Sequence, residues 1–298
     1  MRGGRTLAFR NILIESPCKC TYKGGYLVVR KEDEIVKVHL SEISSVTLQS
    51  TRAFISAYLL SELAKAKISF VVSDEKCNPI GQYLPLYGAH NTSKRIAEQL
   101  EWSEPSKKRV WQHVVKDKIS HQARLLELRG REGFSGQIEG MVDEVRSGDT
   151  TNREAAAARL YFPVLFGNGF SRDIDCPINA ALNYGYAVIL SAVSCEIVSR
   201  GYLTPLGICH RSEYNKFNLA CDLMEPFRPI VDRLVFDNVE VDFTKETRRL
   251  LADVLNVSIC YRDGKYKVSS VISLYVQDCL SALCRRLATS EIEPFDIV

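Results

Sequence analysis

The feature that most constrains the fold is a change in hydrophobic pattern near residue 90. Before it, short runs rich in β-branched residues predict strands at Tyr26–Arg30, Glu34–Leu40 and Ser45–Gln49. After it, apolar residues recur every three or four positions over stretches too long for strands, as between Trp111 and Leu126. The sequence therefore predicts an α+β protein, with a small N-terminal β-sheet domain followed by a larger all-α C-terminal domain.

The same pattern sets the domain boundaries. Residues 1–85 form the predicted β domain, which includes one helix over Ala53–Ala66. Residues 86–100 form a connector that starts with turn formers, and residues 101–298 form the helical domain. Tyr261–Tyr266 contains Asp-Gly, a pair that favours a tight hairpin. The remaining expected strands are 68–72 and 80–84, and the remaining expected helices are 182–197, 244–255 and 269–287.

Composition places the chain among globular proteins of the cell interior. Of 298 residues, 46% are hydrophobic and 25% are charged, which excludes a disordered chain. Apolar runs are too short to span a bilayer, and the first residues lack the apolar core of a secretory signal. We therefore expect a cytoplasmic protein that contacts no membrane. The ten cysteines include no Cys-x-x-Cys pair, which disfavours a structural zinc site.

Positive charge is concentrated in one segment, although the formal net charge is only +3. Lys107–Arg131 carries eight lysines and arginines against two acidic residues. Such a face suits a polyanionic partner, and it is equally typical of the solvated side of a helix.

The residues most suited to catalysis gather between positions 207 and 228. Gly207-Ile-Cys-His210 is followed by Asp222-Leu-Met-Glu225-Pro-Phe-Arg228. Carboxylate oxygens with one imidazole are ligands that Mg²⁺ or Mn²⁺ accepts, while leaving positions for phosphate oxygens. A spacing of three places both carboxylates and the guanidinium on one helix face, unless Pro226 interrupts the helix. The segment predicts metal-assisted chemistry on a phosphate ester.

Structural alternatives exist for two candidate residues. Thr151-x-x-Glu154 matches a capping box, in which the glutamate side chain would serve a backbone N–H at the helix start. His210 follows a short apolar segment and could be a structural histidine with satisfied hydrogen bonds. The residues alone leave both alternatives open.

Four segments in this order resemble the CRISPR adaptation integrase, which inserts new spacers into CRISPR arrays, and in particular its compact type II members. They are Asn152-Arg-Glu154-Ala, Asn179-Ala-Ala-Leu-Asn183-Tyr-Gly185-Tyr186, Gly207-Ile-Cys-His210 and Asp222-Leu-Met-Glu225-Pro-Phe-Arg228-Pro. The resemblance covers nearly the whole chain. It implies that Glu154, His210 and Glu225 are catalytic and bind Mg²⁺ or Mn²⁺, with glutamate where many relatives have aspartate. It leaves Asp222 as either an additional ligand or a group that supports the ligands.

The resemblance also implies the reaction and the partners. A 3′-hydroxyl of a short duplex would attack a phosphodiester at the repeat boundary, and water in its place would make the enzyme an endonuclease. The partners implied are double-stranded DNA, from the spacer precursor and the repeat array, and a second copy of the chain, with residues 1–85 as the dimerisation domain. A small ferredoxin-like CRISPR adaptation protein would complete a hetero-hexamer.

Basic and aromatic residues of the helical domain are candidates for DNA contacts. The basic candidates are Arg228, Lys216, Arg172 and Arg248, with Arg249, Arg285 and Arg286 in addition. Arg228 could instead form an ion pair with Asp222 or Asp232. The aromatic candidates could stack on DNA ends or lie in the core with satisfied hydroxyls, and they are Tyr184, Tyr186 and Tyr214.

Two other functions fit the same residues. A metal-dependent nuclease of repair or fragment processing would use the same site without integration. A DNA-binding scaffold would keep Glu154, His210 and Glu225 for structural reasons only, so their replacement by alanine would leave DNA behaviour unchanged.

Overall fold

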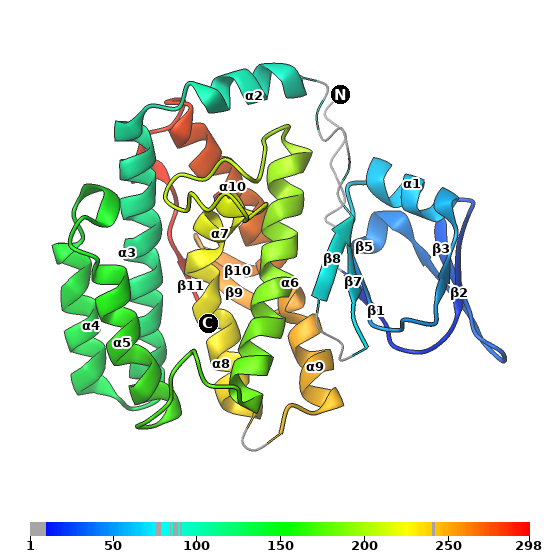
Figure 1. Cartoon of the computed structure of the whole chain (residues 1–298), viewed down its shortest axis with the longest axis horizontal. Helices are drawn as coiled ribbons and strands as arrows, with labels where there is room; N and C mark the ends of the chain where they lie inside the picture. Colours follow the sequence, from blue (N-terminus) through cyan, green and yellow to red (C-terminus); the bar gives the residue numbers. More distant parts are fainter. Residues whose placement is uncertain (1–9, 76–78, 84, 86–88, 90, 240–241) are drawn as a thin grey trace.

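The computed structural model describes residues 10–75, 79–83, 85, 89, 91–239 and 242–298, and it has a β-rich N-terminal part beside a mostly helical part (Figure 1). The β-rich part contains two four-stranded sheets. The order of the first sheet is β1 (Arg10–Ile14), β5 (Ile43–Leu48), β7 (Ser69–Ser73) and β8 (Pro79–Tyr83). The order of the second is β4 (Ile35–His39), β3 (Tyr26–Arg30), β2 (Lys19–Lys23) and β6 (Phe54–Ile55).

One apolar core joins both sheets to helix α1 (Ala57–Lys65). Leu27 and Val29 of β3 and Val46 of β5 are buried with Leu59 and Leu63 of the helix. The helix begins where Ser56 caps the backbone N–H of Leu59, and its leucines recur every four residues on the buried face.

The strand predictions succeed where β-branched residues dominate. β3 matches the predicted range, and the strands expected at 34–40, 45–49, 68–72 and 80–84 coincide with β4, β5, β7 and β8, although position 84 lies outside the described residues. The helix expected over Ala53–Ala66 begins only at Ala57, because Phe54–Ile55 forms strand β6 and Ser56 caps the helix. β2 was not predicted, because Lys-Cys-Thr-Tyr-Lys lacks β-branched character apart from its threonine. It is formed by pairing with β3 across Gly24 and Gly25, both with positive φ. β1 and β6 were also not predicted.

The second part is built mainly from helices. Its first helix, α2, lies within the expected connector, of which residues 86–88 and 90 are outside the described part. A small antiparallel sheet accompanies the helices, with β9 (Ser258–Tyr261) between β10 (Gly264–Lys267) and β11 (Phe295–Asp296), and its hairpin was predicted from Asp-Gly. The helices are α2 (Thr92–Leu100), α3 (Glu104–Leu128), α4 (Glu132–Glu144), α5 (Arg153–Phe166), α6 (Pro177–Ser199), α7 (Asn218–Met224), α8 (Arg228–Asn238), α9 (Lys245–Ala252) and α10 (Val268–Leu283).

Helix α6 is the central helix of this part and packs against α7, α8, α9 and α10. Within the described residues it alone is long and apolar enough to cross a membrane, but 67% of its most apolar window is buried inside the fold. Gly185 lets α6 approach α8 closely, since a Cβ at this position would lie 2.4 Å from Cγ1 of Val231. This close packing explains why the Asn179–Tyr186 segment has glycine at its second-to-last position, without a role for that glycine in catalysis.

Polar contacts join α6 to the first sheet of the β-rich part. The Ser69 and Ser191 hydroxyls are 2.6 Å apart, and the Gln82 amide donates to the Ser191 carbonyl at 2.7 Å. Arg249 of α9 forms an ion pair with Glu15, which follows β1, at 2.6 Å. These contacts hold the two parts side by side (Figure 1).

Candidate active site

The helix start that presents Glu154 is capped by a different residue. The backbone N–H groups of Arg153 and Glu154 donate to Oδ1 and Oδ2 of Asp149, at 2.9 and 3.1 Å. Asp149 lies in a 3₁₀ turn before α5, and Asn152 takes a left-handed conformation that directs the chain into the helix. The capping-box interpretation of Glu154 is therefore wrong, because Asp149 satisfies the N–H groups and Glu154 is left for another contact.

The loop that carries His210 is organised by Asp222. This buried carboxylate accepts the backbone N–H groups of Ile208, Cys209 and His210 at 2.6, 3.1 and 3.0 Å. It also contacts Nδ1 of His210 at 2.6 Å. Gly207 permits this approach, because a Cβ there would lie 2.8 Å from Oδ2 of Asp222. Both oxygens of Asp222 are occupied, so the structure favours a supporting role over that of an additional ligand.

The contact with Asp222 also orients the imidazole of His210. A carboxylate beside Nδ1 favours the tautomer in which Nδ1 carries the proton, so Nε2 presents a lone pair to a ligand. The side chain of His210 is 44% exposed, unlike that of a structural histidine enclosed in a core. Its hydrogen bond to Asp222 raises the pKa of His210, and the charges of Glu225 and Glu154 raise it further.

Glu225 lies at a joint between two helices. α7 ends at Met224, a 3₁₀ turn covers Glu225–Phe227, and α8 begins at Arg228. Pro226 and Pro229 explain the joint, because proline lacks the N–H that an uninterrupted helix requires, yet is tolerated in a first turn. Asp222 lies inside α7, which begins at Asn218. The joint lets Asp222 and Glu225 face different partners.

Lys118 of α3 lies between the two glutamates. Its Nζ is 2.6 Å from Oε1 of Glu154 and 2.5 Å from Oε2 of Glu225. The other oxygen of Glu225, Oε1, contacts Arg228 at 3.1 Å. The lysine and Glu225 side chains are only 9% and 3% exposed, whereas that of Glu154 is 24% exposed. Arg228 thus pairs with Glu225 and not with either aspartate considered above.

The charges of this cluster stabilise one another. Burial alone would raise the pKa of Glu225, but the cations Arg228 and Lys118 outweigh it and hold that pKa below its ordinary value. Burial would likewise lower the pKa of Lys118, yet Glu225 and Glu154 raise it. Glu225, Lys118 and Arg228 therefore stabilise one another in their charged forms.

The donor set suits a hard divalent cation. Two glutamates from distant segments aim one oxygen each at a single cationic centre, and His210 contributes an oriented imidazole. These are ligand types that Mg²⁺ or Mn²⁺ accepts. Among the described residues, however, no group of three or more His, Cys, Asp and Glu side chains is arranged to hold an ion, and the ammonium of Lys118 lies between the two glutamates.

Two predicted DNA-contacting arginines lie beside this cluster. Arg228 is 4.7 Å from the ring centre of Tyr186, and Arg172 is 5.3 Å from the same centre. Arg172 also donates to the side-chain amides of Asn179 and Asn183, which gives both asparagines of the Asn179–Tyr186 segment a positioning role. The Tyr186 hydroxyl donates to buried Asp232, so this tyrosine belongs to the core.

The other candidates lie elsewhere. Lys216 is exposed, and Arg248 packs over Phe243 at 4.7 Å. Tyr184 is buried and accepts a hydrogen bond from Gln49, whereas Tyr214 is 92% exposed.

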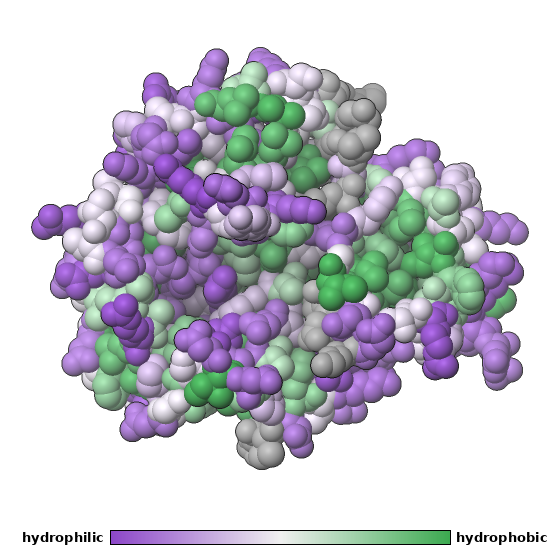
Figure 2. All heavy atoms as spheres, viewed as in Figure 1, coloured by the Kyte–Doolittle hydropathy of each residue, from purple (hydrophilic) through white to green (hydrophobic). Residues whose placement is uncertain are grey.

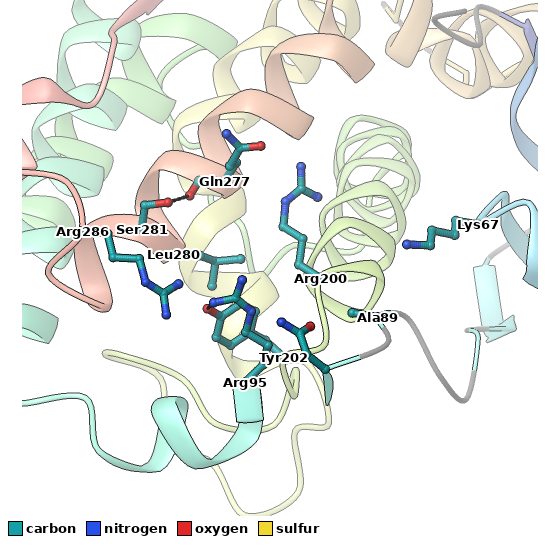
Figure 3. Close-up of a pocket in the computed structure, with 10 residues that line it drawn as sticks. Lys67, Ala89, Arg95, Arg200, Tyr202, Gln277, Leu280, Ser281 and Arg286 are labelled. Atoms are coloured by element: carbon teal, nitrogen blue, oxygen red, sulfur yellow. Dashed lines mark hydrogen bonds between the residues drawn. The ribbon is translucent and has the colours of Figure 1, made fainter. Parts of the chain in front are cut away.

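A separate cleft has a volume of about 780 Å³, and neither Glu154 nor Glu225 lines it (Figure 3). Its lining is basic, and Arg95 and Arg286 share a single carboxylate, Glu98, at 3.0 and 2.6 Å. The remaining lining includes Lys67, Arg200, Tyr202, Gln277 and Ser281. Of the basic candidates named from the sequence, Arg286 lies here.

Two residues of the site were not predicted from the sequence. Asp149 had no distinguishing local pattern. Lys118 did have one, because it follows Val115 by three positions and so falls on the apolar side of its helix, where a lysine requires a buried partner.

Comparisons with known proteins find relatives over most of the chain. The family model described as CRISPR associated protein Cas1 matches residues 12–251 of this chain. A CRISPR-associated endonuclease Cas1 from Neisseria meningitidis serogroup C is 41% identical over 229 residues, which cover 77% of this chain and 75% of the relative. A CRISPR-associated endonuclease Cas1 from Pyrobaculum aerophilum is 28% identical over 233 residues, covering 72% and 76%.

Solved structures share the fold at lower identity. A casposase bound to its integration product aligns with a TM-score of 0.75 and 17% identity, covering 95% of this chain and 94% of the casposase. A Cas1 protein from Thermotoga maritima aligns with a TM-score of 0.73 and 15% identity, covering 92% and 97%. The family match over most of the chain, together with the 41% identical relative, establishes that this chain belongs to the Cas1 family of CRISPR-associated proteins.

Proposed function

We propose that this chain is a divalent-metal-dependent DNA integrase and endonuclease that inserts short DNA fragments into a CRISPR repeat array. The observation that carries the proposal is the convergence of Glu154 and Glu225 on one cationic centre, together with the orientation of the His210 imidazole by Asp222. The charges of both glutamates also act on His210 and raise its pKa. The Neisseria relative is named an endonuclease, and the casposase structure is named as bound to an integration product.

The proposed reaction is a transesterification. The oxygen of a 3′-hydroxyl forms a bond to phosphorus, the target P–O3′ bond breaks, and the proton lost by the attacking hydroxyl is balanced by protonation of the departing oxygen. Mg²⁺ or Mn²⁺, held by Glu154, His210 and Glu225, would supply Lewis-acid stabilisation of the phosphoryl oxygens. Asp222 keeps the His210 lone pair available, and Arg228, whose side chain is 32% exposed, is placed to neutralise phosphate charge. Hydrolysis follows when water takes the place of the hydroxyl.

DNA would be bound by two basic regions. Arg228 and Arg172 flank Tyr186 next to the glutamates. The cleft of Figure 3 supplies further cations, and two of them share one carboxylate, which leaves positive charge to attract a phosphate backbone. A solved Cas1–DNA complex has the same fold, with a TM-score of 0.57 and 14% identity.

The proposed assembly is a homodimer that joins a small ferredoxin-like adaptation protein in a hetero-hexamer, in the cytoplasm. Support comes from apolar side chains gathered over the β-rich part, as Figure 2 shows. On this part Phe54 is 75% exposed, Ile80 69% and Ile35 60%, so apolar side chains are available for contact with a second chain. A structural neighbour is a chain of a Cas6-RT-Cas1–Cas2 complex, and the alignment covers 96% of this chain and 36% of that chain.

The test is strand transfer of a short 3′-hydroxyl duplex into a supercoiled plasmid that carries a repeat array. Reactions contain Mg²⁺ or Mn²⁺ and the small partner protein, and they compare the wild type with His210→Ala and Glu225→Gln. Glu127→Gln is the matched control, because Glu127 is an exposed acid of α3 that pairs with Arg124. We expect metal-dependent joined products from the wild type and the control. Loss of one ligand should remove most activity, and loss of two should add little.

Three outcomes would redirect the proposal. Cleaved DNA without joined products, even with partner and array present, would favour a nuclease without integration. Joined products that persist in both His210→Ala and Glu225→Gln would mean that these residues do not form the catalytic site. The DNA-binding scaffold would be favoured if the wild type showed no metal-dependent chemistry and the variants bound DNA as the wild type does.

A further inference from the structure

Lys118 poses a problem that the proposed function does not resolve. Its ammonium is buried and makes its two described contacts with Glu154 and Glu225, which are 36 and 107 positions away in the chain. A buried lysine is retained only where its charge is paired. The pairing here uses the two glutamates that a divalent cation also requires.

The lysine and a divalent cation cannot share those oxygens. A metal bound to Oε1 of Glu154 and Oε2 of Glu225 would lie within a few ångströms of the ammonium, and like charges at that distance repel strongly inside a protein. Glu225 keeps a second cation regardless, because Arg228 contacts its other oxygen. Lys118 has a flexible four-carbon stem, so its ammonium can move while the backbone of α3 stays in place.

We propose that Lys118 is a resident counter-cation of the metal site, which a divalent cation must displace, and whose released ammonium pairs with a phosphate of bound DNA. In the metal-free protein Lys118 neutralises two carboxylates that would otherwise repel each other. Metal binding then breaks the ion pairs of Lys118 with the two glutamates, and an ion pair between Lys118 and a DNA phosphate replaces them. Metal and DNA therefore bind cooperatively, and the DNA-free protein holds metal weakly. The inference rests on the proposed function, since it concerns the same site.

The experiment measures Mn²⁺ affinity by electron paramagnetic resonance, with and without a short DNA duplex. The proteins are the wild type, Lys118→Met, Lys118→Arg and the control Lys116→Met, which removes a lysine two positions away on the same helix. We expect Lys118→Met to bind Mn²⁺ at least about tenfold more tightly than the wild type without DNA, a gain of about 1.4 kcal/mol. Lys118→Arg and Lys116→Met should not gain affinity.

The duplex supplies the second readout. It should increase Mn²⁺ affinity in the wild type and have a smaller effect in Lys118→Met, because the displaced charge is absent. Lys118→Met should also melt at a lower temperature in EDTA and recover with Mn²⁺, whereas a residue with a purely structural role would lower the melting temperature equally in both conditions. If the methionine variant does not fold, Lys118→Gln, which keeps hydrogen-bond donors without charge, takes its place.

Mn²⁺ affinity that is equal to or weaker than wild type in the neutral variants would overturn the inference. Its failure differs from failure of the proposed function. Joined DNA products with no gain in Mn²⁺ affinity would refute the role of Lys118 alone. A gain in affinity without joined products would retain Lys118 as the counter-cation and refute integration.

Discussion

Replacing Asp222 by asparagine tests how the site is held together. The carboxylate accepts four hydrogen bonds, two on each oxygen, from the N–H groups of Ile208 and Cys209 on Oδ2 and from the N–H and Nδ1 of His210 on Oδ1. An amide keeps only one acceptor oxygen, so one of these pairs must face an NH₂ group. If that pair belongs to His210, Nδ1 becomes the acceptor, the proton moves to Nε2, and the ligand lone pair is lost.

The expected loss of stability follows from the two hydrogen bonds that the amide cannot accept. Two charge-assisted hydrogen bonds at about 1.5–3 kcal/mol each give a loss of about 3–6 kcal/mol in the free energy of unfolding. Urea denaturation followed by circular dichroism measures this loss. The comparison requires that the free energy of unfolding depend equally steeply on urea concentration in both proteins. Strand transfer should fall by about 10–100-fold or more, as when other groups that orient metal-binding histidines are removed.

The control for this substitution is Asp237→Asn. Asp237 is 41% exposed and pairs with Arg129 at the surface, so its replacement should cost less than about 1 kcal/mol. If Asp222→Asn were as stable as this control and retained strand transfer, the carboxylate would not organise the loop, and the proposed tautomer of His210 would be refuted.

Three further predictions concern the cap, the cleft and a buried acid. Asp149→Ala should lose about 0.5–2 kcal/mol of stability and most strand transfer, because it releases the start of the Glu154 helix, whereas Thr151→Ala, measured beside it, should retain activity. Replacing Arg200 or Arg286 by alanine should weaken duplex binding, measured by fluorescence anisotropy. The slope of log affinity against log salt concentration should decrease in magnitude by about 1 for each lost phosphate contact. An unchanged slope would mean that the DNA binds elsewhere. Burial raises the pKa of Asp232 from 3.8 to about 6, so the folded state binds this proton more readily than the unfolded chain. The free energy of unfolding should then decrease by about 2 kcal/mol as pH rises from 4 to 6, and a urea series showing the same pH dependence in Asp232→Asn would contradict this.

Local patterns were sufficient for much of the fold. β3 and the hairpin of β9 and β10 follow from side-chain preferences and turn chemistry that act over a few residues. α6 follows from apolar residues repeated on one face. β2 required its partner strand, because its own residues do not favour a strand over a loop.

For the site, the segment 207–228 by itself suggested His210, Asp222 and Glu225 as candidate ligands, and the family resemblance added Glu154 to the predicted set. It did not reveal the partners of those residues. Asp149 as the cap, Asp222 as the support of His210 and Lys118 as the counter-cation depend on where the folded chain places each group. The Lys118–Glu225 contact joins positions 107 residues apart, and only packing of α3 against the α7–α8 joint brings them together. Local sequence pattern carries the identity of charged groups, whereas their neutralisation is a matter of distance in a low-dielectric interior, which tertiary structure decides.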